Sequence, residues 1–205
     1  MNWKRSVGIL VAMLILACCA YGVELKQVNK IRIKGTTTQI VFTPDGKYFL
    51  TVSQKGIDVW ETATAKHIRK IDDREALSAA FTKKGNMFAY GTMDGKIHIC
   101  SFPDCKCDVG FRASQKHIRQ ILFVKKDKII MTNLLKGFDK KGKLKIDLKF
   151  DSPANAIALS PDGKLLASAH ENGKVIIWNI RRKRKMMEVG THPAEANGVL
   201  FSHDG

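Results

Sequence analysis

The chain has 205 residues and carries 35 Lys and Arg against 19 Asp and Glu, which gives a net charge of +16 at pH 7. Because 44% of the residues are hydrophobic and 26% are charged, the composition excludes a disordered polymer and predicts a folded body. The excess of positive charge favours an anionic partner, such as a membrane, an acidic polymer or a nucleic acid, and leaves the fold open.

The N-terminal segment 1–22 has the pattern of an export leader. Lys4 and Arg5 precede an apolar run over residues 7–20, and small residues follow it. This run is short for a bilayer span, which takes about 20 apolar residues. We therefore expect an exported protein of the bacterial envelope, either periplasmic or anchored to the membrane. Three outcomes stay open: cleavage near Gly22, lipidation of Cys18 as the first mature residue, and an uncleaved N-terminal membrane anchor.

An internal repeat occupies the rest of the chain. One phrase is written IVFTPDGK at 40–47 and IALSPDGK at 157–164, and VLFSHDG at 199–205 begins another copy. Two sets of large residues keep the same period of about 40 residues, which is typical of propellers, solenoids and other repeat arrays. The first set is Phe42, Phe81, Phe123, Leu159 and Phe201, and the second is Trp60, Cys100, Phe138 and Trp178.

Each repeat has the pattern of four short strands, here called a to d in chain order. The first repeat predicts strands at 38–42, 48–52, 57–60 and 67–71, rich in β-branched and aromatic residues and separated by Gly- and Pro-containing turns. The third repeat is the least regular. We expect residues 23–205 to form one repeat domain, with blades at about 36–71, 72–112, 113–150 and 151–190 and a partial fifth at 191–205.

Two segments carry a family resemblance. IDVWE at 57–61 and VIIWN at 175–179 resemble the closing signature of WD repeats, and His192 with the residues after it resembles the opening of such a repeat. The resemblance covers residues 36–205 and implies an all-β propeller whose blades are four-stranded antiparallel sheets. Propellers of the YVTN type share the PDGK turn and remain an alternative.

The family's stabilising hydrogen-bond set is incomplete in this chain. That set joins an opening His, a Ser or Thr on strand b, an Asp in the b–c turn and a Trp on strand c, and no repeat shows all four. The fourth repeat has Ser168 and Trp178 but Asn172 at the turn. We therefore expect apolar packing, more than this network, to hold the divergent blades together.

The number of blades predicts an open arrangement. Four blades and a partial fifth favour an incomplete seven-bladed ring, with the sequence as a fragment of a longer protein. A compact four-blade ring is the alternative. The segment 30–33 is expected to be a lone outer strand of the kind that closes such rings and removes an open sheet edge.

One end of the blades is predicted to be strongly basic. Because neighbouring strands are antiparallel, the a–b and c–d turns of every blade share that end. Its strongest feature is the run Arg181, Arg182, Lys183, Arg184 and Lys185. We expect this run to contact an anionic surface of lipid or acidic polymer. The alternative is that such side chains only keep the protein soluble and protect strand edges.

Three cysteines and a histidine lie close together in the second repeat. His98 and Cys100 share one face of a predicted strand, and the following turn brings Cys105 and Cys107 back toward them. A Cys100–Cys107 disulfide suits an oxidising compartment. Free thiols are the second alternative, and a metal site formed by the four residues is a weaker third.

No catalytic motif or cofactor-binding loop is recognisable. We expect a non-catalytic scaffold without a cofactor, monomeric or part of a complex, that binds unidentified protein partners and presents its basic face to anionic surfaces. The alternative is a ligand-binding or enzymatic propeller whose site lies in missing blades. A nucleic-acid ligand is disfavoured, because few aromatic residues lie among the basic turns.

Overall fold

A computed structural model describes residues 30, 31, 33, 35–72, 75–107, 109–152 and 154–205. Within these residues the chain forms sixteen β-strands, grouped into four separate sheets of four antiparallel strands. The first two sheets comprise β1 (Thr37–Phe42), β2 (Tyr48–Ser53), β3 (Gly56–Glu61) and β4 (His67–Asp72), then β5 (Ala76–Phe81), β6 (Met87–Thr92), β7 (Lys96–Ser101) and β8 (Val109–Arg112).

The other two sheets comprise β9 (Ile121–Val124), β10 (Ile129–Thr132), β11 (Lys136–Asp139) and β12 (Leu144–Asp147), then β13 (Ala154–Leu159), β14 (Leu165–His170), β15 (Lys174–Asn179) and β16 (Arg184–Thr191). Each sheet is a simple meander, with strands bonded in chain order. The expected all-β architecture of four-stranded antiparallel blades is therefore confirmed, and we call the sheets blades 1 to 4.

The recurring PDGK phrase forms the turn between strands a and b. In blade 1 the hydroxyl of Thr43 donates to Asp45 (2.6 Å), and Asp45 in turn accepts the backbone N–H of Lys47 (3.1 Å). Gly46 supplies the positive φ of +70° that the turn requires. The turn closes when the backbone N–H of Thr43 donates to the carbonyl of Tyr48 (2.8 Å). The motif recurs because each copy forms the same turn between the first two strands of a blade.

The two sets of repeated large residues lie opposite one another in each sheet. In blade 1, Phe42 pairs with Phe49 on strand b, and Phe49 pairs with Trp60 on strand c. We call these three positions the cross-strand row. The rows of the other blades are Phe81–Phe88–Cys100, Phe123–Ile130–Phe138 and Leu159–Leu166–Trp178. A single register is thus repeated four times.

The core lies between neighbouring blades. The row of blade 2 packs against Leu50 and Val59 on the facing side of blade 1. The rows of blades 3 and 4 pack in the same way against the blade before each of them. Since each blade has one face against its predecessor and the other against its successor, the sheets depend on one another for burial.

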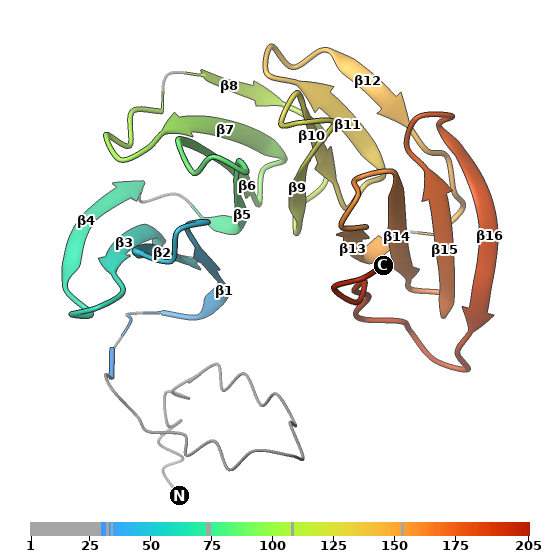
Figure 1. Cartoon of the computed structure of the whole chain (residues 1–205), viewed down its shortest axis with the longest axis horizontal. Helices are drawn as coiled ribbons and strands as arrows, with labels where there is room; N and C mark the ends of the chain where they lie inside the picture. Colours follow the sequence, from blue (N-terminus) through green and yellow to red (C-terminus); the bar gives the residue numbers. More distant parts are fainter. Residues whose placement is uncertain (1–29, 32, 34, 73–74, 108, 153) are drawn as a thin grey trace, which may run out of the picture.

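Side chains of the innermost strands also join adjacent blades. The side-chain oxygen of Gln39 accepts the backbone N–H of Ala79 in blade 2 (2.8 Å). Gln120 in blade 3 accepts from the N–H of Ile157 (2.7 Å) and donates to its carbonyl (2.8 Å). These bonds join blade 1 to blade 2 and blade 3 to blade 4, and strands β1, β5, β9 and β13 line the inner side of an arc in Figure 1.

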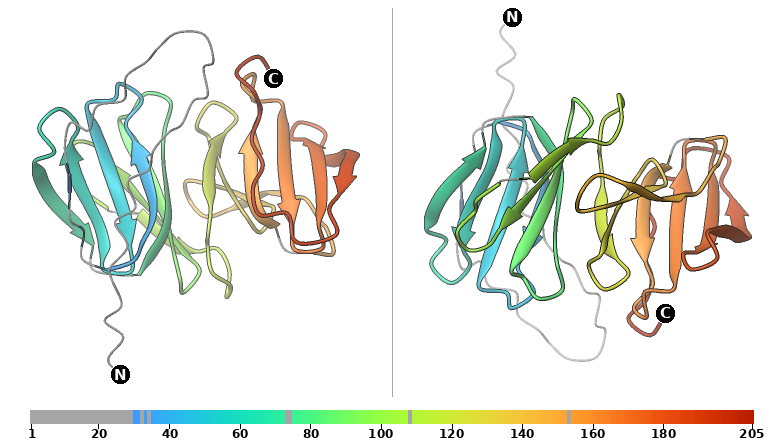
Figure 2. Two further views of the ribbon diagram at one scale, coloured as in Figure 1. Left: turned by 90° about the horizontal axis from the view of Figure 1, so that it is seen from below. Right: turned by 90° about the horizontal axis from the view of Figure 1, so that it is seen from above.

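The arc is open. Figures 1 and 2 show the four blades side by side around a common centre, with a gap between blade 1 and the C-terminal end. At the blade 1 edge of the gap, Phe42 is 55% exposed, whereas its counterpart Phe123 is 8% exposed beneath blade 2. The row of blade 1 therefore lacks the covering sheet that the other three rows have.

Neither end of the described chain adds a strand to the four sheets. Lys30, Ile31 and Ile33 lie in no strand, because no described strand runs beside them to accept their hydrogen bonds. Residues 192–205 also form no strand, although Ala196 is buried and its N–H donates to the carbonyl of His170 (3.0 Å).

The expected leader and the lipidation of Cys18 lie outside the described residues. The part of the chain that the structure describes has no helical segment with the length and apolarity of a bilayer span.

Candidate functional site: the basic end of the blades

The meander places the a–b and c–d turns at the same end of each of the four blades, because consecutive strands run in opposite directions. Lysines are frequent in these turns and most of them are exposed, and we call this region the basic end. Its exposed lysines in the a–b turns are Lys47, Lys83, Lys84, Lys125, Lys126, Lys128 and Lys164.

The predicted basic run divides between a turn and a strand. Arg181, Arg182 and Lys183 are exposed in the turn after β15, where the N–H of Arg182 donates to the side-chain oxygen of Asn179 (2.8 Å). Arg184 and Lys185 begin β16 and are also exposed. Among the described residues, no ion pair involves the three arginines or Lys183.

Lys185 differs from the rest of the run. Its ammonium lies 2.9 Å from Glu188 and 5.9 Å from the centre of the Phe150 ring. The bonds from its ammonium and from that of Lys174 hold the pKa of Glu188 below its usual value. Lys185 is therefore partly neutralised within its own sheet, and the four preceding bases carry the free charge of the run.

β16 combines this charge with exposed apolar side chains. All eight of its residues are exposed, although it pairs along its length with β15. Met186, Met187 and Val189 are 54%, 55% and 60% exposed. An outer strand with these properties offers both an unpaired backbone edge and an apolar patch next to positive charge.

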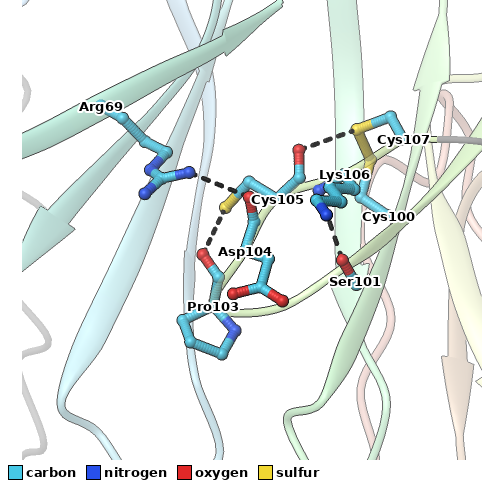
Figure 3. The surroundings of a disulfide bond; sticks show 8 residues. All are labelled: Arg69, Cys100, Ser101, Pro103, Asp104, Cys105, Lys106 and Cys107. Carbon is cyan, nitrogen blue, oxygen red and sulfur yellow. Dashed lines mark hydrogen bonds between the residues drawn. A yellow bond between two sulfur atoms is a disulfide. The ribbon is translucent and has the colours of Figure 1, made fainter.

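The cysteine loop lies at the same end of blade 2 (Figure 3). Cys100 on β7 and Cys107 are joined by a disulfide, and Cys105 between them is a free thiol. Burial raises the pKa of the Cys105 thiol, whose sulfur lies 3.2 Å from the carbonyl of Pro103. Arg69 of blade 1 donates to the carbonyl of Asp104 (2.9 Å) and so connects this loop to the neighbouring blade.

The residues of the metal alternative at this loop are not brought together by the structure. In the described part of the chain, no group of three or more His, Cys, Asp or Glu side chains is arranged to hold a metal ion. The sulfurs of Cys100 and Cys107 are bonded to each other, and His98 stacks on Tyr90 with ring centres 4.8 Å apart. His98, Cys100, Cys105 and Cys107 therefore do not form a ligand set.

One buried histidine, His170, was not predicted from the sequence as a site residue. In blade 4 the indole N–H of Trp178 donates to Ser168 (2.7 Å), whose hydroxyl bonds Nε2 of His170 (2.7 Å). Nδ1 of His170 then bonds the carbonyl of Ser152 (2.9 Å). His170 thus occupies the His place of the WD-type network from strand b itself. Its spacing of two residues from Ser168, on the same face of a strand that pairs with a tryptophan-containing strand, is the signal that identifies it.

Comparisons with known proteins agree with this architecture. The family model "WD domain, G-beta repeat" matches residues 144–179, which run from β12 to the end of β15. Autophagy-related protein 16 of Arabidopsis thaliana is 25% identical over 190 residues, which cover 84% of this chain and 36% of that protein. The chain thus spans about a third of the length of this curated relative.

The fold and the blade 4 network define a class of protein, an all-β arc of propeller-type blades. Together with the two matches, they support a WD-repeat family for this chain.

Proposed function

We propose that the chain is a non-catalytic WD-repeat scaffold that binds a protein partner along the outer edge of blade 4. The observation that carries this proposal is β16, where Met186, Met187 and Val189 are exposed beside the unpaired bases of residues 181–184. Exposed apolar side chains beside charge are typical of interaction sites. The partner suited to this edge is a segment with apolar side chains and acidic flanks.

A photo-crosslinking experiment tests this role. A photoreactive amino acid is placed at Met187 in the full chain expressed in its own cells, and a matched control carries it at Lys55, an exposed residue in the b–c turn at the opposite end. We expect one protein to be cross-linked from Met187 and not from Lys55, and the purified pair to bind each other. Equal labelling from both positions, or none from Met187, would contradict the proposal.

The proposal extends to an anionic context for the basic end. Each Lys or Arg near an anionic membrane contributes about 1 kcal/mol, so the four unpaired bases at 181–184 would together contribute about 4 kcal/mol. Replacing Arg181, Arg182 and Arg184 by Glu should abolish sedimentation with anionic vesicles at about 0.1 M salt. The control is replacement of Lys47 and Lys164 by Glu at other turns of the same end. An equal loss in both variants would show that only net charge matters.

We also propose that the protein is exported, with residues 1–22 as its leader. The support is the sequence pattern of basic start, apolar run and small residues. Intact mass of the native protein separates the outcomes: a lipidated N-terminus at Cys18, a cleaved soluble form, or a retained anchor. An N-terminus that retains Met1 in a protein that fractionates with the cytoplasm would refute export.

A further inference from the structure

We propose that a hollow between blades 2 and 3 at the basic end binds a compact ligand carrying two or more phosphate groups. The inference rests on the proposed role of the basic end and names the ligand class for one part of it. The hollow has a volume of about 500 Å³ and is bordered by the a–b turns of both blades and the c–d turn of blade 3. This volume falls in the range of small-molecule sites.

The charge of the hollow is unbalanced. Five lysines and two aspartates line it, which leaves a net charge of +3. The lysines are Lys84, Lys126, Lys128, Lys140 and Lys141, and the aspartates are Asp127 and Asp139. Within the described residues, none of these five ammonium groups takes part in an ion pair.

Both aspartates are engaged by the turns themselves. Asp139 accepts the backbone N–H groups of Lys141 (3.0 Å) and Lys143 (2.9 Å), and its other oxygen lies 3.3 Å from the ammonium of Lys145. These bonds, that of Lys143 first, hold the pKa of Asp139 below its usual value. Asp127 accepts the backbone N–H of Lys83 across the blade boundary (3.0 Å). The carboxylates thus build the walls and do not neutralise the five lysines.

The other two blades provide an internal comparison. In blades 1 and 4 the a–b turn is PDGK, and its single lysine lies near its own aspartate. Lys47 is 4.0 Å from Asp45, and Lys164 is 3.0 Å from Asp162. Blades 2 and 3 have TKKGN and VKKDK in this place, with lysines where the other turns have proline and aspartate. Among the a–b turns, the unpaired lysines are therefore a feature of blades 2 and 3.

The turn of blade 3 also has an unusual backbone. Lys125, Lys126 and Asp127 have φ values of +52°, +56° and +63°, in a conformation that side chains with a Cβ disfavour. The PDGK turns place a glycine at their positive φ, and VKKDK has none. Backbone held in such conformations is concentrated at functional sites, because a specific constellation must be maintained there. Here the strained turn holds Lys126 at the hollow.

Lys140 reaches the hollow from the c–d turn of blade 3. It is half-buried, and its ammonium lies 3.4 Å from the sulfur of Met87 in blade 2, which also lines the hollow. Lys126 and Lys140 thus approach the same space from the a–b and c–d turns of blade 3.

Lysine ammonium groups have three donors each and act as compact point charges, which suits phosphate oxygens. A single carboxylate would leave most of these charges unmatched, and no aromatic side chain lines the hollow to stack on a base. Clustered phosphates, either free or on a lipid headgroup, fit this chemistry.

Calorimetric titration of the full chain with inorganic tripolyphosphate tests the site. We expect saturable binding with one site per chain, and at least a tenfold loss of affinity in the double variant Lys126→Ala/Lys140→Ala. The matched control is Lys47→Ala/Lys164→Ala, which removes the same charge from the same end and should change affinity less than twofold. The variant Lys126→Arg/Lys140→Arg keeps the charge and should retain binding, which separates loss of the site from loss of the fold.

Two arms distinguish the ligand sources and the proposals. Vesicles with phosphate monoester headgroups compete with tripolyphosphate if a lipid is the source, whereas competition only by soluble polyphosphates indicates a free ligand. Absence of saturable binding by the unmodified chain, or an equal loss in the Lys47/Lys164 control, would overturn the site. Failure of the cross-link at Met187 with intact tripolyphosphate binding would overturn the scaffold role and leave this site standing.

Discussion

The buried network of blade 4 makes a sharp prediction about stability. Replacing Ser168 by Ala removes the hydroxyl between Trp178 and His170, which lie 2.7 Å from it on either side. Ser168 and His170 are fully buried and Trp178 is 3% exposed, so the two bonds made by the hydroxyl are lost away from water. An unsatisfied buried polar group costs about 1–3 kcal/mol, and we therefore expect the free energy of unfolding to fall by about 2–4 kcal/mol.

The equivalent position of blade 1 is the matched control. Thr51 accepts the indole N–H of Trp60 (2.9 Å), but Trp60 lies in the uncovered row and is only half-buried. Thr51→Ala should therefore cost about 1 kcal/mol, because water can replace the lost bond. Urea unfolding followed by far-ultraviolet circular dichroism gives both values. The reasoning is refuted if Ser168→Ala lies within 0.5 kcal/mol (roughly the noise of such data) of the unmodified chain, or if the two substitutions cost the same.

Three further predictions concern acid, a glycine and a thiol. Bonds from Lys96 and Thr92 lower the pKa of Asp94 to about 2. The ionised carboxylate therefore stabilises the folded state fully above pH ~4, and this stabilisation is lost as the pH falls through ~2. Asp94→Asn should flatten the acid side of a curve of Tm against pH. Gly173→Ala should lower the free energy of unfolding in urea by about 2 kcal/mol or more, because φ is +79° and a Cβ would lie 2.2 Å from a backbone oxygen. Gly46→Ala, at φ +70° with no atom near the added Cβ, should lower it by about 1 kcal/mol. Equal losses would contradict a role for the close backbone approach at Gly173. Cys105 should react slowly with iodoacetamide at pH 7, since burial raises the pKa of its thiol. Among Cys100, Cys105 and Cys107, mass spectrometry should find one alkylated cysteine before reduction and three after it. Three alkylated cysteines before reduction would contradict the disulfide.

The blades themselves could be predicted from the sequence because the repeat carries its own register. Phe42 and Trp60 lie in one cross-strand row, so residues that recur every 40 or so positions mark the same place in each sheet. The turn chemistry of PDGK fixed where strands a and b meet. These signals depend on residues close together in the sequence, so they can be recognised even where the family's hydrogen-bond set is incomplete.

Other features depend on contacts that a sequence does not show. Residues 30–33 have the composition of an outer strand, but a strand needs a neighbour, and the described sheets provide none. The role of His170 depends on Trp178, on a different strand. At the basic end, lysines that pair with a turn aspartate, such as Lys164, cannot be told by sequence from those that do not, such as Lys126. Only the distances separate them.

The uncovered row of blade 1 gives the arc a direction. Three times in this molecule, the row of one blade is covered by the face of the blade before it that carries residues such as Leu50 and Val59. One end of the arc therefore presents an acceptor surface, Phe42–Phe49–Trp60, and the other presents the complementary surface of blade 4, to which Ile177 and Met187 contribute as a cross-strand pair. A further blade in the same orientation can stack at either end through the contacts that join neighbouring blades within the arc. A blade with its two faces exchanged cannot make these contacts. The two ends of the arc are therefore different, and blades stack only head to tail.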